Sequence, residues 1–203
     1  MKNVSSLCRL IPNHARAVLA GFFALSMGLT SFAAPETLSI DHSSRIKPVD
    51  QGKAPLCWLA SAAMMESSKE GEAVSMSKLA QDLGEPFLSY FKNKKGLPFD
   101  DTEVFAQKLS LRRAGFQSFQ VSWWADRLRA GPIWVMGWVE GASAHARVVV
   151  GISGPSDEPE NITVTYVDPW GGVKKTQKFT EFIAFYEGVA QQFTTLPPQL
   201  LYY

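Results

Sequence analysis

The chain changes character near Gly131-Pro132, and this change limits the folds that it can adopt. Before that point, apolar periodicity and turn residues predict helices over residues 57–69, 75–83, 101–114 and 122–130, with a surface loop over residues 84–98. After it, β-branched and aromatic runs predict strands over residues 133–138, 145–152, 162–167 and 173–179. A short helix over residues 181–186 follows. Helices first and strands afterwards predict an α+β fold.

The N-terminal segment predicts a signal peptide over residues 1–33. Lys2, Arg9 and Arg16 are its basic residues, residues 17–29 form an apolar run, and Ser31-Phe32-Ala33 is a small-x-small cleavage site. Pro35 argues against cleavage after Ala34, so we expect the cut after Ala33. The alternative is an uncleaved signal anchor, but the apolar run of about 13 residues is short of the roughly 20 that span a bilayer.

The predicted leader limits the partners of the mature chain. It takes three of the 20 basic residues and none of the 19 acidic ones, so the mature chain is slightly acidic. We therefore expect no nucleic-acid partner and no stable membrane insertion after cleavage.

We expect a secreted or periplasmic monomer with an extended lead-in over residues 34–50 and one domain over residues 51–203. That domain would have a helical half (51–130) and a β half (131–203).

The segment from Gln51 to Ser61 has the composition of a catalytic thiol site. Cys57 follows a Pro-containing loop and begins an apolar helical run, and it is the only cysteine that remains after the leader is removed. A helix N-terminus favours a thiolate, and its free N–H groups can donate hydrogen bonds to an oxyanion. Gln51 could add a side-chain amide donor. A buried, inert cysteine is the alternative for Cys57 taken alone.

A thiol nucleophile needs a base and a group that orients that base. After removal of the leader the chain retains two histidines, His42 in the lead-in and His145 at the start of a predicted strand. We expect His42 to be exposed. The next predicted strand ends at Asp168, so neighbouring strands could place Asp168 beside the ring of His145. One cysteine and two histidines offer no metal cluster of recognised spacing, so we expect no metal.

Three blocks of the sequence resemble papain-like cysteine proteases, in particular the bacterial secreted branch with an aspartate in the triad. The first is Gln-x5-Cys-Trp-x-x-Ser, from Gln51 to Ser61. The second is His-Ala-x4-Gly, from His145 to Gly151. The third is Asp-x-Trp-Gly, from Asp168 to Gly171. The resemblance covers roughly residues 51–187. It departs from the plant and lysosomal members at Ala54, where they carry a disulfide cysteine, and at Asp168, where they carry asparagine.

The resemblance implies a papain-like fold, with a helical half that carries the nucleophile packed on an antiparallel β half. It implies an exported cysteine peptidase that needs no cofactor and acts on proteins or peptides. The catalytic residues would be Cys57, His145 and Asp168, and the oxyanion hole would be formed by Gln51 and the backbone N–H of Cys57. Trp58 and Trp170 would support the site, with Trp170 shielding the hydrogen bond of the histidine from water.

Two other classes of function remain open. An acyl transferase or a peptidoglycan amidohydrolase could use the same triad, and a binding module could retain a protease scaffold without activity. The Cys-Trp motif and the upstream glutamine argue against the first. Intact Gln51, Cys57, His145 and Asp168 argue against the second. Three lysines of the predicted loop are interpreted as a solvated surface, with lining of the substrate cleft as the alternative: Lys92, Lys94 and Lys95. The paired residues Trp123-Trp124 and Met64-Met65 are interpreted as core.

Overall fold

A computed structural model describes residues 35–141, 143–194 and 198–203 of the protein. The predicted signal peptide, residues 1–33, lies outside the described residues, so both the leader and its cleavage site stay predictions. No helix within the described ranges is long and apolar enough to cross a membrane.

The first half of the described chain is mainly helical. The helix α1 (Cys57–Glu70) agrees with the prediction and ends at Gly71, which adopts the left-handed conformation with φ of 81°. The helix α2 (Met76–Leu83) also agrees, and the side chain of Ser75 caps it by accepting a hydrogen bond from the backbone N–H of Lys78. Short 3-10 turns are η1 (Ser43–Arg45) and η2 (Phe99–Asp101).

Two predictions in this half were wrong in part. The expected loop over residues 84–98 contains the helix α3 (Phe87–Lys92), because Phe87 is fully buried against Trp58 and Phe105. The expected helix over residues 101–114 is only α4 (Thr102–Lys108). Ser110 then has a φ of 55°, which no helix tolerates, and the chain continues as the strand β2 (Arg112–Ala114).

An antiparallel sheet organises the rest of the chain. The predicted strands are present as β3 (Ile133–Trp138), β4 (Ala144–Pro155), β5 (Thr163–Asp168) and β6 (Val173–Lys178). The strands β1 (Thr37–Asp41) and β7 (Leu200–Tyr202) were not predicted. The order is β2-β7-β3-β4-β5-β6, and β1 pairs with the far end of β4. The sheet therefore takes strands from both sides of residue 131.

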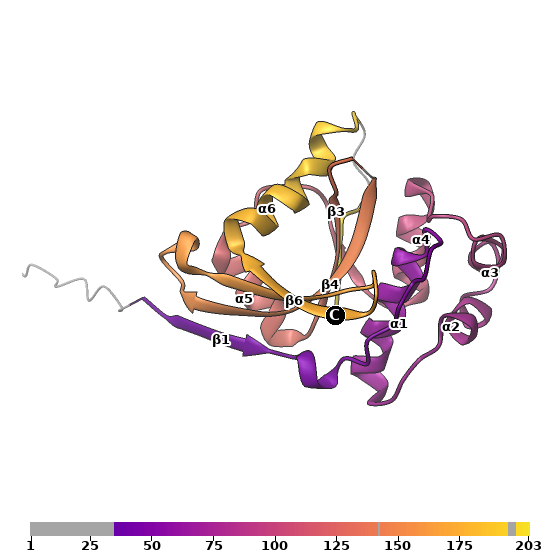
Figure 1. The fold of residues 1–203 in the computed structure, drawn as a ribbon, viewed down its shortest axis with the longest axis horizontal. Coiled ribbons are helices and arrows are strands. Elements are labelled where there is room, and N and C mark those ends of the chain that lie inside the picture. Colours follow the sequence, from indigo (N-terminus) through magenta and orange to yellow (C-terminus); the bar gives the residue numbers. More distant parts are fainter. Residues whose placement is uncertain (1–34, 142, 195–197) are drawn as a thin grey trace, which may run out of the picture. The chain divides into compact units, whose positions relative to one another are not determined.

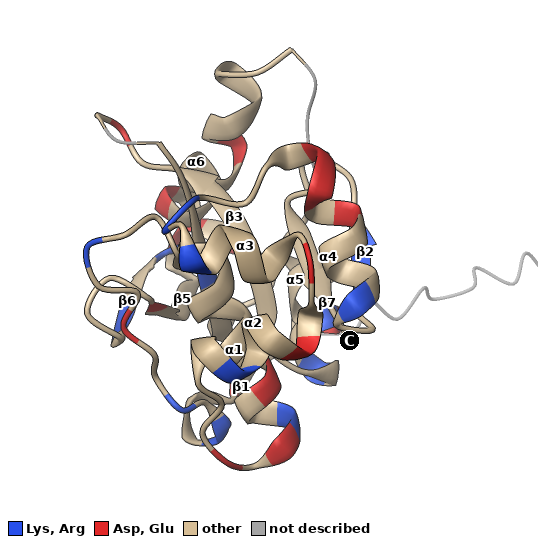
Figure 2. Ribbon diagram, turned by 90° about the vertical axis from the view of Figure 1, so that its right-hand side faces the viewer, with Lys and Arg blue, Asp and Glu red and all other residues tan. Residues whose placement is uncertain are grey.

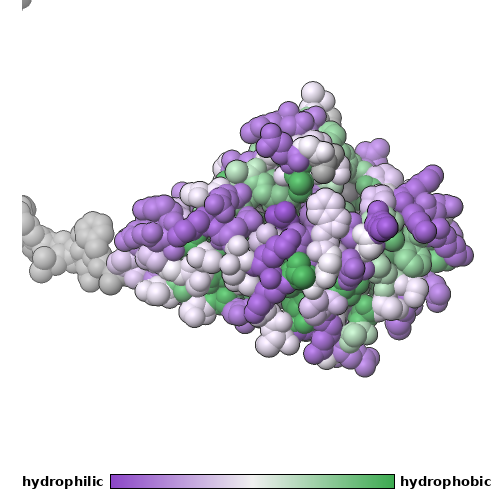
Figure 3. All heavy atoms as spheres, in the orientation of Figure 1, coloured by the Kyte–Doolittle hydropathy of each residue, from purple (hydrophilic) through white to green (hydrophobic). Residues whose placement is uncertain are grey.

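Helices cover both faces of this sheet (Figure 1). The helices α1 to α4 pack on one face, where Ala146, Val148 and Val150 of β4 join their core. The helices α5 (Val121–Ala130) and α6 (Phe179–Glu187) pack on the other, against Val149 and Ile152. Val148, Val149 and Val150 thus alternate between the two cores. A register shift between Val149 and Gly151 then places Ile152 on the side of α5 and α6. The view in Figure 3 shows hydrophilic side chains over much of the surface, with scattered apolar ones between them. The α+β fold predicted from the sequence is confirmed.

Candidate active site

Cys57 is the first residue of α1, and its free thiol is partly exposed. The helix begins there because Leu56 is outside helical geometry, with φ of −101° and ψ of 19°. The first backbone N–H groups of a helix have no intrahelical partner and carry a partial positive charge. The thiol therefore lies where a negative charge on sulfur, or on an oxygen bonded next to it, is stabilised.

His145 and Asp168 lie on neighbouring strands and contact each other. Val148 of β4 pairs with Val167 of β5, and this register brings the end of β5 beside the start of β4. The Nε2 atom of His145 is 2.8 Å from Oδ1 of Asp168. An ionised carboxylate can only accept, so Nε2 donates to it. Nδ1 then remains for the thiol of Cys57, which lines the same two hollows as His145. The expected juxtaposition of the strands is therefore present.

The ring of His145 is nearly buried, with 5% of its surface exposed. Burial alone favours the neutral ring and lowers its pKa. The hydrogen bonds with Asp168 and with Cys57, together with the negative charges of both partners, outweigh burial and raise the pKa of His145 above its ordinary value. The site thus favours an imidazolium beside the sulfur.

Asp168 has further donors, besides His145, that the sequence did not predict. Burial would raise the pKa of its carboxyl, but hydrogen bonds from His145, from the backbone N–H of Trp170 and from Lys175 hold it well below its usual range. The Nζ atom of Lys175 on β6 is 3.1 Å from Oδ2 of Asp168, and Nε of Arg147 is 3.7 Å from it. Arg147 lies two residues after His145 on β4, and this strand period was the available signal.

Gln51 lies on a loop that is tied to the turn after β5. Its backbone N–H donates to the carbonyl of Pro169 at 2.9 Å, and Oδ1 of Asp50 accepts from the N–H of Gly171 at 3.1 Å. The Nε2 atom of Gln51 donates one hydrogen bond to the carbonyl of Ala54 at 2.9 Å. An amide nitrogen carries two N–H groups, so one remains for a ligand.

The two tryptophans of the predicted motifs have different surroundings. Trp58 is buried; its Nε1 donates to the carbonyl of Lys95, and its own carbonyl accepts from Nε1 of Trp134, each at 3.2 Å. It therefore holds α1 against both the α3 region and the sheet. Trp170 is 49% exposed, and its ring lies 5.0 Å from the ring of His145 at an angle of 31°. Its ring therefore lies against the ring of His145.

Two hollows meet at Cys57 and His145. One is an apolar pocket of about 290 Å³, with walls that include Leu97, Phe99, Trp134, Met136, Trp138 and Phe193. The other is a smaller and more polar hollow of about 170 Å³ beside Gln51, Lys53 and Trp170. His42 lines neither; it is half-buried, not exposed as expected, because its Nε2 contacts the carbonyl of Leu128. Within the described ranges, no three His, Cys, Asp or Glu side chains converge as metal ligands would.

The fold and this site define a class: a cysteine peptidase of papain-like fold. The comparisons then give the family. Residues 41–187 match the family described as papain-like cysteine protease AvrRpt2, which is a family of bacterial effectors, and the chain belongs to it. The protein is thus a cysteine-type peptidase with protein substrates. A comparison with curated proteins finds no match to this chain.

Proposed function

We propose that the protein is an exported peptidase in which Cys57, His145 and Asp168 act as a catalytic triad. The observation that carries this proposal is the ring of His145, which is bonded to a buried carboxylate and lines the same two hollows as the Cys57 thiol at a helix N-terminus. Nucleophile, base and orienting group in this order are the requirements of thiol acyl transfer.

The reaction follows from these positions. The sulfur of Cys57 attacks the peptide carbonyl, and Gln51 with the backbone N–H of Cys57 stabilises the oxyanion that forms. The C–N bond then breaks, and the imidazolium of His145 gives its proton to the leaving amine. Water attacks the resulting thioester, and its proton returns to His145 as the acid product leaves. Asp168 holds the ring in position throughout, Trp170 keeps water from their hydrogen bond, and no cofactor takes part.

Substitutions and a thiol probe test the triad. Cys57→Ala should abolish both casein hydrolysis and labelling by E-64, while circular dichroism stays unchanged. His145→Ala should lose nearly as much activity, because members of a triad act as a unit. His42→Ala is the matched control and should keep full activity. If His42→Ala were the damaging change and His145→Ala were neutral, the assignment of the base would be wrong.

The same assay separates hydrolysis from the other uses of a triad. We expect new free N-termini from casein and no release of fragments from peptidoglycan. Adding a primary amine should not divert the acyl group into a new amide. Amide formation in preference to hydrolysis would assign the protein to acyl transfer.

Export rests on the pattern of residues 1–33. Sequencing the N-terminus of protein recovered from the medium or the periplasm should give Ala34 as the first residue. An exported protein that still begins at Met1 would contradict the proposal.

A further inference from the structure

A third hollow adjoins the active site and is lined by lysines. Its volume is about 560 Å³, and it lies between the loop before α1 and the C-terminal end of α3. Lys53 lines it from the loop, and Lys92 and Lys94 line it from the α3 side. We call it the lysine pocket. Figure 2 shows basic residues in blue at this end of α3.

The lysine pocket adjoins the smaller, more polar hollow at Cys57 and His145, which we call the catalytic hollow. Gln51, Lys53, Ala54 and Pro55 line both, and the catalytic hollow also contains Cys57 and His145. An extended peptide advances about 3.3 Å per residue. Because the two hollows share four lining residues, we expect a substrate with its scissile carbonyl at Cys57 to place a side chain one or two residues away in the lysine pocket.

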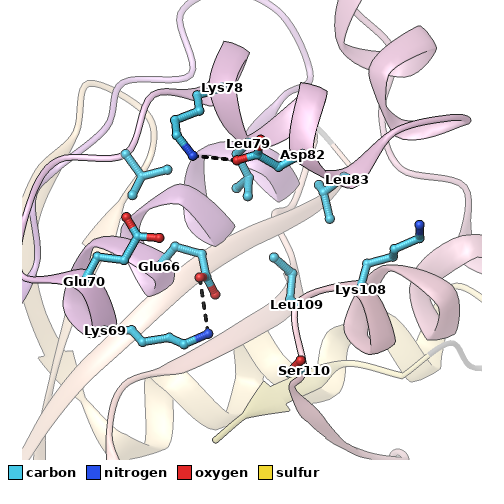
Figure 4. Close-up of a pocket in the computed structure, with 11 residues that line it drawn as sticks. Glu66, Lys69, Glu70, Lys78, Leu79, Asp82, Leu83, Lys108, Leu109 and Ser110 are labelled. Atoms are coloured by element: carbon cyan, nitrogen blue, oxygen red, sulfur yellow. Dashed lines mark hydrogen bonds and ion pairs between the residues drawn. The ribbon is translucent and has the colours of Figure 1, made fainter.

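The charge of the lysine pocket is unbalanced. Its lining contains no acidic residue, and its three lysines form no ion pair with any carboxylate that the structure describes. Another lysine-lined pocket, beside α1 and α2, is different (Figure 4). There Lys69 lies 3.5 Å from Glu66, and Lys78 lies 2.7 Å from Asp82. Its lysines are balanced by acidic residues of the chain itself, whereas those of the lysine pocket are left for a ligand.

The wall that carries two of these lysines is held in place. The N–H of Lys95 donates to the carbonyl of Tyr90 at 2.9 Å, and the carbonyl of Lys95 accepts from Trp58, the residue after Cys57. Lys94 has a φ of 54°, a conformation that a long side chain rarely adopts. A fixed backbone presents the ammonium groups without the entropy cost of ordering a loop on binding.

We propose that Lys53, Lys92 and Lys94 form a subsite for an acidic side chain of the substrate, within two residues of the scissile bond. This inference rests on the proposed function of the adjoining hollow. An ammonium cluster without internal counter-ions attracts a carboxylate and repels a basic side chain, so the pocket selects by attraction and by repulsion.

Peptide hydrolysis tests the subsite. A set of fluorogenic peptides places Asp, Ala or Lys at each of the two positions on either side of the scissile bond. At one position kcat/KM should be highest for the Asp peptide and lowest for the Lys peptide. Each step, from Asp to Ala and from Ala to Lys, should lower kcat/KM about fivefold to tenfold, as expected for two or three exposed ion pairs. The preference should shrink as salt rises from about 0.1 M to about 1 M, because the Debye length falls from about 10 Å to about 3 Å.

Charge reversal locates the effect. Lys92→Glu with Lys94→Glu should invert the order at that position and leave hydrolysis of the Ala peptide within about twofold, because that peptide makes no ion pair there. Lys108→Glu reverses one charge in the pocket of Figure 4, which shares no lining residue with the lysine pocket, and should leave the order unchanged.

Two outcomes would overturn the inference while leaving the proposed function intact. One is equal hydrolysis of Asp, Ala and Lys peptides at all four positions. The other is an inversion caused equally by Lys108→Glu, which would make the preference an effect of net charge. A failure of the proposed function has a different signature: no peptide is cleaved, and E-64 does not label Cys57.

Discussion

The carboxylate of Asp168 contacts more cations than the orientation of a histidine requires. His145 and the backbone N–H of Trp170 occupy Oδ1, while Lys175 and Arg147 face Oδ2. The surplus positive charge has two opposed effects. It keeps Asp168 ionised, which supports the imidazolium, and it lies close enough to repel that imidazolium directly. Asparagine at this position would remove the first effect and leave the second.

Asp168→Asn should therefore lower the pKa of His145. The amide oxygen still accepts from Nε2, but the negative charge is gone and Lys175 loses its counter-ion. The alkaline limb of the profile of kcat/KM against pH should move to lower pH, since His145 loses its proton earlier. Adding Lys175→Met should move the limb part of the way back, because it removes the unbalanced cation.

Lys174→Met is the matched control for that pair. Lys174 precedes Lys175 on β6, but its Nζ atom contacts Ser43 and makes no hydrogen bond to Asp168. In the Asp168→Asn background it should leave the profile unchanged. An alkaline limb that is the same in wild type and in Asp168→Asn would contradict the electrostatic coupling of the two residues.

At the scale of elements, the loop before α1 and the turn after β5 form one unit. Asp50 accepts hydrogen bonds from Gly52 and from Gly171, and Gln51 donates to Pro169. The loop that would carry the oxyanion donor is thus attached to the turn that follows the orienting aspartate. Each element fixes the other, so a change in the turn should affect catalysis through the loop.

Gln51→Ala should separate the oxyanion site from the nucleophile. The second N–H of its amide would bond to the carbonyl oxygen most strongly once that oxygen becomes tetrahedral, so its loss should lower kcat by about 100-fold to 1,000-fold. Alkylation of Cys57 by iodoacetamide forms no oxyanion and should proceed at close to the wild-type rate. An equal loss in both assays would mean that Gln51 shapes the loop or the thiolate instead.

Gly172→Ala should impair catalysis through the same unit. Gly172 has a φ of 62°, and a Cβ there would lie 3.2 Å from the backbone of both Val49 and Asp50. Gly71 also has a positive φ, 81°, but a Cβ there meets nothing within 4 Å. Both alanine variants should lose about 1–2 kcal/mol of stability from the left-handed conformation. Only Gly172→Ala should also lower kcat, and a comparable loss of activity in Gly71→Ala would contradict the coupling.

At the scale of the whole molecule, the sequence predicted the elements whose signals are local. The helix α1 has an apolar run and a terminal glycine, and β3 to β6 are β-branched runs with clear turns. It also predicted the residues that the structure brings together at the active site, since Cys57, His145 and Asp168 follow known motifs. It missed what depends on distant partners. The residues of α3 form a helix because Phe87 has aromatic neighbours from α1 and α4 to pack against.

The short strands β1 and β7 were missed for the same reason. Neither has a pattern that is longer than a few residues, and each exists because a strand far away in the sequence offers it an edge. Lys175 and Arg147 were missed because their role depends on the register between β4, β5 and β6. Propensity sets local structure, but pairing and register come from the assembled sheet.

The docking of β1 explains the glycine of the His-Ala-x4-Gly block. Gly151 lies opposite Asp41 of β1, and a Cβ on it would collide with the backbone carbonyl of Ile40. Gly151→Ala should therefore displace β1 and cost about 1–3 kcal/mol of unfolding free energy. Gly115→Ala is the control, because a Cβ there meets nothing within 4 Å and φ is ordinary.

Leu38→Ala should weaken the same contact from the other side. Leu38 is 3% exposed and packs in the core beneath α5 and α6, so its truncation should cost about 2–5 kcal/mol. If Gly151→Ala acts by displacing β1, the double variant should lose less stability than the two single losses combined, since β1 can be undocked only once. Urea unfolding gives the free energy of unfolding of both single variants and of the double variant. Strict additivity would mean that Gly151 supports the sheet independently of β1, and the motif glycine would then need another explanation.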